Sequence, residues 1–84
     1  MESARNIIGP QLMRIRNAKG WSQAELAAAC QRAGWDVSRG VIARIEGGVR
    51  WVGDFELLEI ASILEVCVSE LFPPDAQRRF RKQN

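Results

Sequence analysis

Two serines that stand at helix starts, Ser22 and Ser38, constrain this chain more than any other feature of its sequence. Ser22 and Glu25 have the spacing of a capping box, in which each side chain satisfies a free backbone N–H of the other residue. Apolar pairs bracket both serines at hydrophobic-staple spacing: Trp21 with Leu26, and Val37 with Ile42. We therefore predict one helix from Ser22 to residue 33, stopped at Gly34, and a second over residues 38–46.

The remaining apolar residues also recur at helical spacing, and no segment alternates with a period of two. We expect three further helices: residues 7–19 capped by Asn6, residues 55–64 capped by Asp54, and a short one over residues 68–72 closed by two prolines. The residues expected to face inward are Ile8, Leu12, Ile15, Leu26, Cys30, Ala33, Ile42, Ile45, Phe55, Leu58 and Ala61, with Leu57 as a further candidate. These patterns predict an all-α, compact five-helix bundle with one domain over residues 1–74 and a polar, basic tail over residues 75–84, either a frayed helix or disordered.

Several absences argue against an enzyme. The chain has no histidine, and its two cysteines are distant from each other, so the usual catalytic bases and zinc spacings are missing. No Gly-rich phosphate loop occurs, and we expect no cofactor, metal or small-molecule substrate. Cys30 and Cys67 both lie in apolar helical patterns, which favours buried free thiols over a redox switch. No segment is apolar enough to span a membrane and the residues before position 6 are polar, so we expect a cytoplasmic protein.

Charge is unevenly distributed along the chain, although the net charge is only +2. Residues 1–50 carry eight basic and four acidic side chains, whereas residues 51–74 carry five acidic side chains and no basic one. Residues 75–84 are basic again, with four basic side chains and one acidic. Such polarity suits a partner of one charge on one face, although solvated helices also show it.

The two capped helices and the short Gly-containing turn between them have the arrangement of a helix-turn-helix unit. In that unit the second helix presents its outer face to base edges, and the first crosses the phosphate backbone. Arg39 and Arg44 fall on the predicted outer face, where a guanidinium can read a guanine edge. Gly40 and Ala43 lack bulk, so the backbone of this helix can sit deep in a groove.

As a set, these residues resemble the Cro/C1-type helix-turn-helix family, also called the XRE family, over about Ile8 to Phe72. The segments that carry the resemblance are Ile8, Leu12, Ile15-Arg16, Gly20 to Ala27, Ser38, Ile42, Ile45 to Gly48, Leu58, Ile60-Ala61, Leu64, Val66 and Leu71-Phe72. The resemblance implies a lambda-repressor-like bundle that binds double-stranded DNA. It further implies a transcriptional regulator, most often a repressor, acting as a homodimer on half-sites about 34 Å apart. We expect the dimer surface near residues 68–72 and their flanks.

The resemblance also assigns roles to individual residues. It implies that Gln23 contacts a phosphate and braces the second helix of the unit, and that Ser38, Arg39, Gly40 and Arg44 face the DNA. Arg50 and Trp51, in the following loop, would approach the backbone, although we favour a packing role for Trp51. Arg16 and Glu46 match a partly buried ion pair between the first and third helices.

This sequence departs from the family pattern in three places. Residues 31–37 add about one helical turn before the second helix of the unit, Gly40 replaces a reading side chain, and Glu65 and Cys67 replace a glycine and a serine. The alternative function is a protein-interaction module, such as an antitoxin-like factor, with the acidic fourth helix and the basic tail as contact surfaces. The tail is also a candidate for non-specific attraction to DNA, or for a plain solvated terminus.

Overall fold

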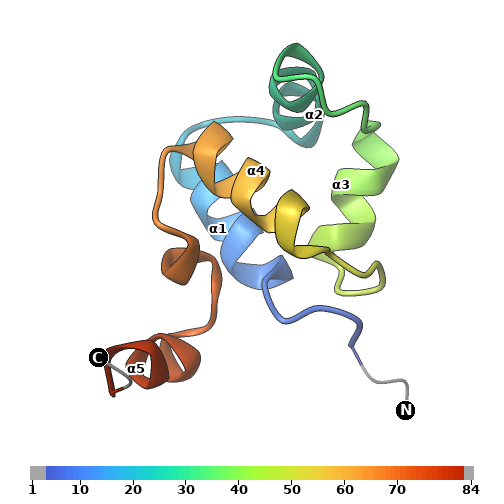
Figure 1. Cartoon of the computed structure of the whole chain (residues 1–84). Coiled ribbons are helices and arrows are strands. Elements are labelled where there is room, and N and C mark those ends of the chain that lie inside the picture. Colours follow the sequence, from blue (N-terminus) through green and yellow to red (C-terminus); the bar gives the residue numbers. More distant parts are fainter. Residues whose placement is uncertain (1–3, 83–84) are drawn as a thin grey trace.

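The computed structural model describes residues 4–82, with side chains described as far as Arg79. It is all-helical over this range (Figure 1). The elements are α1 (Gly9–Ala18), α2 (Gln23–Arg32), α3 (Arg39–Glu46), α4 (Asp54–Leu64), the 3-10 helix η1 (Val68–Leu71) and α5 (Pro74–Lys82). The predicted all-α bundle is confirmed. Residues 1–3 of the predicted domain and residues 83–84 of the predicted tail lie outside the described residues.

The caps predicted for α1 and α4 differ from those in the structure. The N-cap of α1 is Ile8, two residues after the predicted Asn6, and it has no side-chain cap; the Asn6 side-chain oxygen instead accepts hydrogen bonds from the backbone N–H groups of Ile8 and Gly9 in the turn before the helix. The cap predicted for α4 is wrong. Its N-cap is Gly53, whose N–H donates to the Glu56 carboxylate at 3.1 Å, because Glu56 occupies the third helical position, from which a long side chain reaches back.

The C-terminal segment is helical. Pro74 was expected to close the last helix but is the first residue of α5. Proline suits this position because the N–H that it lacks would have no partner within the helix. Asp75 lies in the first turn of α5 and pairs with Arg78 one turn later. The tail, for which a frayed helix and a disordered segment were the two alternatives, is thus helical as far as Lys82, and it contacts η1 while standing apart from the body formed by α1 to α4 (Figure 1).

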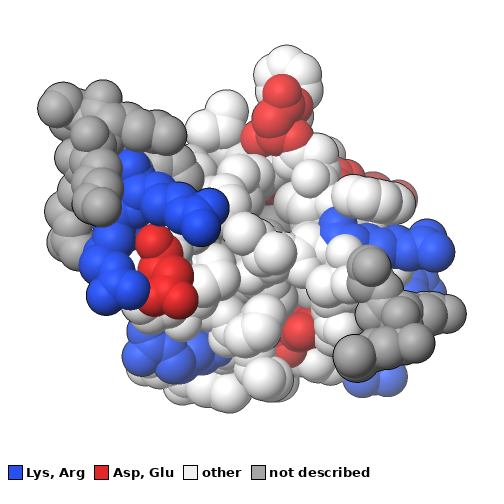
Figure 2. Space-filling model, turned by 90° about the horizontal axis from the view of Figure 1, so that it is seen from below, with Lys and Arg blue, Asp and Glu red and all other residues white. Residues whose placement is uncertain are grey.

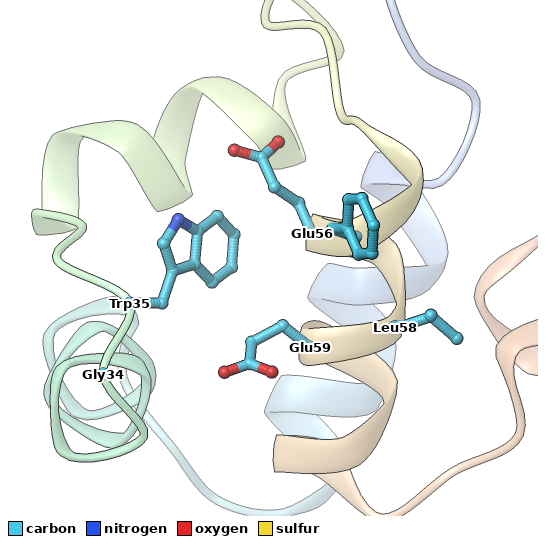
Figure 3. A pocket seen from close by; sticks show the side chains of 6 residues that line it. Gly34, Trp35, Glu56, Leu58 and Glu59 are labelled. Atoms are coloured by element: carbon cyan, nitrogen blue, oxygen red, sulfur yellow. The ribbon is translucent and has the colours of Figure 1, made fainter.

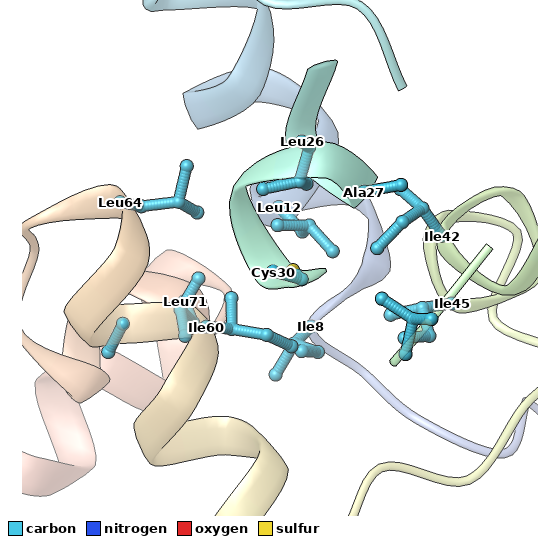
Figure 4. Close-up of a cluster of buried hydrophobic side chains, with 12 residues drawn as sticks. Ile8, Leu12, Leu26, Ala27, Cys30, Ile42, Ile45, Ile60, Leu64 and Leu71 are labelled. Atoms are coloured by element: carbon cyan, nitrogen blue, oxygen red, sulfur yellow. The ribbon is translucent and has the colours of Figure 1, made fainter. Parts of the chain in front are cut away.

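The core lies where α1, α2, α3, α4 and η1 converge (Figure 4). Its fully buried side chains are Leu12, Leu26, Cys30, Ile42, Ile45, Ile60, Leu64 and Leu71. Of the α4 residues predicted to face inward, Ala61 is buried and Leu57 packs against the core, but Phe55 and Leu58 were predicted wrongly, since they are 84% and 58% exposed. The buried stripe of α4 consists of Ile60, Ala61 and Leu64, which lie at helical spacing. Ala33 was also expected inside but is exposed, because it is the C-cap of α2.

A close backbone approach fixes α1 against the end of α3. A Cβ on Gly9 would lie 2.6 Å from the carbonyl oxygens of both Ile45 and Glu46, so only glycine fits at this crossing. The Asn6 amide strengthens the same junction by donating to the carbonyls of Ile45 (3.1 Å) and Arg50 (2.8 Å). The C-terminal end of α3 is therefore held by the N-terminal segment of the chain.

Candidate nucleic-acid interface

The helix-turn-helix unit is formed by α2 and α3 and by the segment between them. The Ser22 hydroxyl accepts from the Glu25 N–H at 3.0 Å, and the Glu25 carboxylate accepts from the Ser22 N–H at 2.8 Å, so the predicted capping box is present. The Ser38 hydroxyl accepts from the Val41 N–H at 3.3 Å and caps α3. In this arrangement Ser38 satisfies its own helix start, and its backbone remains at the exposed end of α3.

The longer connection before α3 is an ordered part of the unit. Gly34 has φ +94°, a backbone conformation that favours glycine and reverses the chain after α2. The Gln31 side chain donates to the Val37 carbonyl at 2.7 Å, and Val37 itself is buried beside the core. The extra turn therefore packs as a brace for the start of α3, and Gln31 is a positioning residue that its polar type alone did not reveal.

The outer face of α3 is available to a ligand. Ile42 and Ile45 are fully buried, whereas Arg39 and Arg44 are exposed and Gly40 is half-buried on the other side of the helix. A Cβ on Gly40 would meet only the Ser38 hydroxyl, at 3.6 Å, so the surface here is open. Arg39 and Arg44 therefore lie on the outer face of α3, and neither packs into the core.

A chain of polar contacts links this face to the interior. Arg16 donates to both carboxylate oxygens of Glu46, at 2.6 and 3.1 Å, so the predicted ion pair between α1 and α3 is present and buried. Glu46 also accepts from the Gln23 amide at 3.0 Å, and the Gln23 carbonyl oxygen accepts from Arg39 at 3.4 Å. The hydrogen bond to Glu46 raises the pKa of Arg16 above its ordinary value.

This network changes the interpretation of Gln23. Its amide nitrogen is engaged by the buried Glu46 carboxylate, so its carbonyl oxygen is the end turned towards Arg39. An oxygen acceptor cannot bind a phosphate directly. The bracing role implied for Gln23 is therefore the one that its contacts support, and the phosphate role would require an N–H of the amide that Glu46 does not use.

The loop between α3 and α4 contains Arg50 and Trp51, which were expected to approach the DNA backbone, and their side chains lie in different environments. Arg50 donates to both carboxylate oxygens of Glu56, at 2.9 and 3.1 Å, and so ties the loop to α4. This pairing lowers the pKa of Glu56 and raises that of Arg50. Trp51 is 70% exposed, so the packing role favoured for it is wrong. The sequence did not reveal the Arg50–Glu56 pair because the loop conformation sets it.

The cysteines also differ from each other. Cys30 is fully buried in the core, and burial, with a smaller contribution from the charge of Glu59, raises its pKa to about 11. Cys67 is exposed, which contradicts the buried thiol expected there, because the chain leaves α4 through a left-handed residue, Glu65 at φ 59°, before η1 begins. The departure from the family pattern at residues 65–67 thus changes a local junction and leaves the fold intact.

Charge on the surface gathers in separate regions. Viewed from below, Figure 2 shows basic side chains at two opposite sides of the molecule, with largely uncharged surface between them. Within residues 4–82, no helix is long and apolar enough to cross a membrane. The same residues contain no group of three or more His, Cys, Asp or Glu side chains that could hold a metal ion.

Comparison with known proteins agrees with this geometry. The profile of the Helix-turn-helix family matches residues 12–71, which span both helices of the unit and most of the core. A search of curated protein sequences gives no match. The chain belongs to the helix-turn-helix family of the Cro/C1 (XRE) type, a family of DNA-binding transcription regulators.

Solved structures with the same fold are regulators. The restriction-modification controller protein C.AhdI from Aeromonas hydrophila is 32% identical, with a TM-score of 0.67 over 77% of this chain and 87% of that one. The DNA-binding domain of BldD is 28% identical, with a TM-score of 0.70 over 87% of this chain and all of that one. The clp gene regulator ClgR from C. glutamicum is 27% identical, with a TM-score of 0.69 over 84% of this chain and 86% of that one.

Proposed function

We propose that this protein is a sequence-specific transcriptional repressor that inserts α3 into the major groove of duplex DNA. The observation that carries the proposal is the exposure of Arg39 and Arg44 on a helix whose opposite face is fully buried. A major groove about 12 Å wide admits one helix, and arginine is the side chain best suited to a guanine edge. The protein acts in the cytoplasm as a homodimer on a two-fold operator.

The two arginines have different roles in this proposal. Arg39 is oriented before binding, because Gln23 accepts from it and is itself fixed by the buried Glu46. A side chain held in position loses less conformational freedom on binding. Arg44 lies in the last turn of α3, and its side chain samples more conformations than that of Arg39. Ser38 and Gly40 let the backbone of the helix start approach the DNA, and Trp51 presents an exposed ring to the sugar-phosphate backbone.

Selection from a random duplex library, followed by mobility-shift titration at several salt concentrations, tests the proposal. We expect a two-fold consensus and an affinity that falls steeply with salt, since each neutralised phosphate releases counterions. Arg44→Ala should lose about 1–3 kcal/mol of discrimination at one base pair. Arg14→Ala removes an exposed arginine from α1 and is the matched control, with little expected effect.

The loop arginine provides a second measurement. Arg50 reaches a phosphate only by leaving Glu56, so Arg50→Ala should weaken binding to all sequences alike and should also loosen the α3–α4 loop. Failure to select any sequence, together with affinity that is unaffected by salt or by Arg39→Ala with Arg44→Ala, would overturn the proposal. That result would favour the protein-interaction module, for which α4 offers exposed apolar surface.

A further inference from the structure

The segment before α1 lies along the loop that follows α3. The Arg5 N–H donates to the Gly48 carbonyl at 2.7 Å, and the Asn6 amide donates to the Ile45 and Arg50 carbonyls at 3.1 and 2.8 Å. The two Asn6 contacts join residues that are 39 and 44 positions apart in the chain. The backbone of Arg5 is therefore held in a fixed place beside the end of the helix-turn-helix unit.

The same loop connects Arg5 to α3 itself. Val49, the residue after Gly48, donates its N–H to the Arg44 carbonyl at 3.0 Å. Gly48 has φ +77°, a backbone conformation that favours glycine, and a Cβ there would lie 3.8 Å from the Ala4 Cβ. The backbones of Arg5 and Arg44 are thus bonded to two consecutive residues of one turn. The groove on the other side of α4, where Trp35 faces Glu56 and Glu59 (Figure 3), takes no part in this arrangement.

The guanidinium of Arg5 is available to an anion. Arg5 is exposed, and within residues 4–79, whose side chains the structure describes, its side chain forms no ion pair or hydrogen bond. Arg50 differs, because it donates to both carboxylate oxygens of Glu56. A phosphate bound by Arg50 therefore replaces an existing pair, whereas a phosphate bound by Arg5 replaces only water.

Basic side chains from three segments gather at this end of α3. They are Arg5 before α1, Arg44 on α3 and Arg50 in the loop. Glu46, at the end of α3, is buried in its ion pair with α1, and Glu56 is paired with Arg50. One of the two basic sides in Figure 2 lies on the right, where Figure 1 places α3 and the described start of the chain. Such a cationic surface is suited to the phosphate backbone.

We propose that Arg5 is a further DNA-binding residue, whose guanidinium binds a backbone phosphate at the edge of the groove that receives α3. The segment is fixed to the loop before binding, so its backbone loses little conformational freedom when the duplex arrives. A phosphate contact carries no sequence information, so Arg5 raises affinity and sets orientation without choosing bases. This inference rests on the proposed function, which supplies the duplex.

Mobility-shift titration of Arg5→Ala on the selected operator and on an unrelated duplex tests the inference. We expect the Kd to rise about tenfold on both, since a hydrogen bond from a charged donor is lost. The slope of log affinity against log salt should shrink by about one. The variant keeps the backbone N–H that binds Gly48, so its circular dichroism and unfolding midpoint should match the wild type. Arg14→Ala, at an exposed arginine of α1, is the matched control and should leave the Kd unchanged.

Ethylation of single phosphates locates the contact. One phosphate whose ethylation weakens wild-type binding should become indifferent in Arg5→Ala, whereas Arg5→Lys, which keeps the charge, should remain sensitive to it. Wild-type affinity and salt slope in Arg5→Ala, while the wild type still selects a consensus, overturn this inference alone. A changed consensus in Arg5→Ala also overturns it, because Arg5 would then contact a base. A wild type that binds no duplex contradicts the proposed function, and this inference with it.

Discussion

Glu46 is a buried carboxylate that depends on two neighbours, the Arg16 guanidinium and the Gln23 amide. Removing one member of a buried ion pair leaves the other charge without a partner in a region that water reaches poorly. We therefore expect Glu46→Ala to lower the free energy of unfolding by about 3–5 kcal/mol, measured by urea denaturation.

Replacing both members of the pair distinguishes the loss of their attraction from the cost of leaving one buried charge without a partner. Arg16→Met with Glu46→Leu fills the same space with apolar groups, so it should cost clearly less than Glu46→Ala alone. Equal losses for the single and the double variant would show that the pair contributes mainly through its own attraction. The same double variant leaves Gln23 without its buried partner, and DNA binding should then lose the preset orientation of Arg39.

The two thiols should differ sharply in reactivity. The thiolate is the reactive form, and Cys30 has a pKa of about 11 and no exposed surface, whereas Cys67 is exposed. An alkylating reagent at pH 7 should therefore modify one thiol rapidly and the second only in denaturant, as followed by mass spectrometry. Cys67→Ser should abolish the rapid step, and rapid labelling that persists in this variant would show that the core around Cys30 opens.

At the scale of whole elements, the crossing of α1 and α3 depends on a residue without a side chain. Gly9→Ala places a Cβ against two backbone carbonyls that cannot move aside without shifting α3. We expect a loss of about 1–3 kcal/mol in thermal or urea unfolding. Gly40→Ala is the matched substitution in open space and should be neutral or stabilise by up to about 1 kcal/mol. Similar losses for both variants would indicate a propensity effect and contradict a specific crossing.

The start of α4 should respond to acid. Arg50, and to a smaller extent the Gly53 N–H, hold the pKa of Glu56 below its ordinary value of 4.5. A carboxylate with a lowered pKa contributes stability that is complete above pH 4.5 and is lost as the pH falls through the lowered value. The difference in unfolding free energy between the wild type and Glu56→Gln should therefore be largest near pH 7 and shrink below pH 4. A difference that stays constant between pH 7 and pH 3 would contradict the paired carboxylate.

The sequence predicted elements where local chemistry decides the structure. Ser22 with Glu25, and Gly34 after α2, set a helix start and a helix stop through contacts within a few residues, and the structure has them as expected. The orientation of α4 could not be predicted in this way. Phe55 and Leu58 are as apolar as the residues that the helix buries, and only the packing of α2 and η1 decides which stripe faces the core.

Polar contacts between distant parts of the chain in the candidate site also could not be predicted from neighbouring residues in the sequence. The Arg16–Glu46 pair was expected only through the family resemblance, since 30 residues separate its members. Gln23 as a link to Arg39, Asn6 as a clamp on the end of α3, and Arg50 as the partner of Glu56 all require the folded arrangement. Amide and guanidinium side chains have several possible partners, and their residue type does not say which partner the fold brings near.

At the scale of the whole molecule, the chain measures 35 × 33 × 23 Å with α5 included, and its long dimension is close to the rise of about 34 Å in one turn of B-DNA. In the proposed homodimer, two copies held against each other therefore set a fixed separation between their α3 helices. Such a dimer is rigid in register, so its affinity should depend on the spacing of the two half-sites as well as on their sequence.

Operators with altered spacing measure this dependence directly. Five extra base pairs turn the second half-site to the opposite face of the duplex, and ten restore its face but place it one turn further away. With either insertion, binding at one half-site no longer places the second α3 at its own half-site. Both insertions should therefore lower affinity by about a hundredfold, towards that of a single half-site. A monomeric form of the chain should bind all three operators alike. Equal affinity of the wild type for the three spacings would mean that each α3 reads its half-site independently.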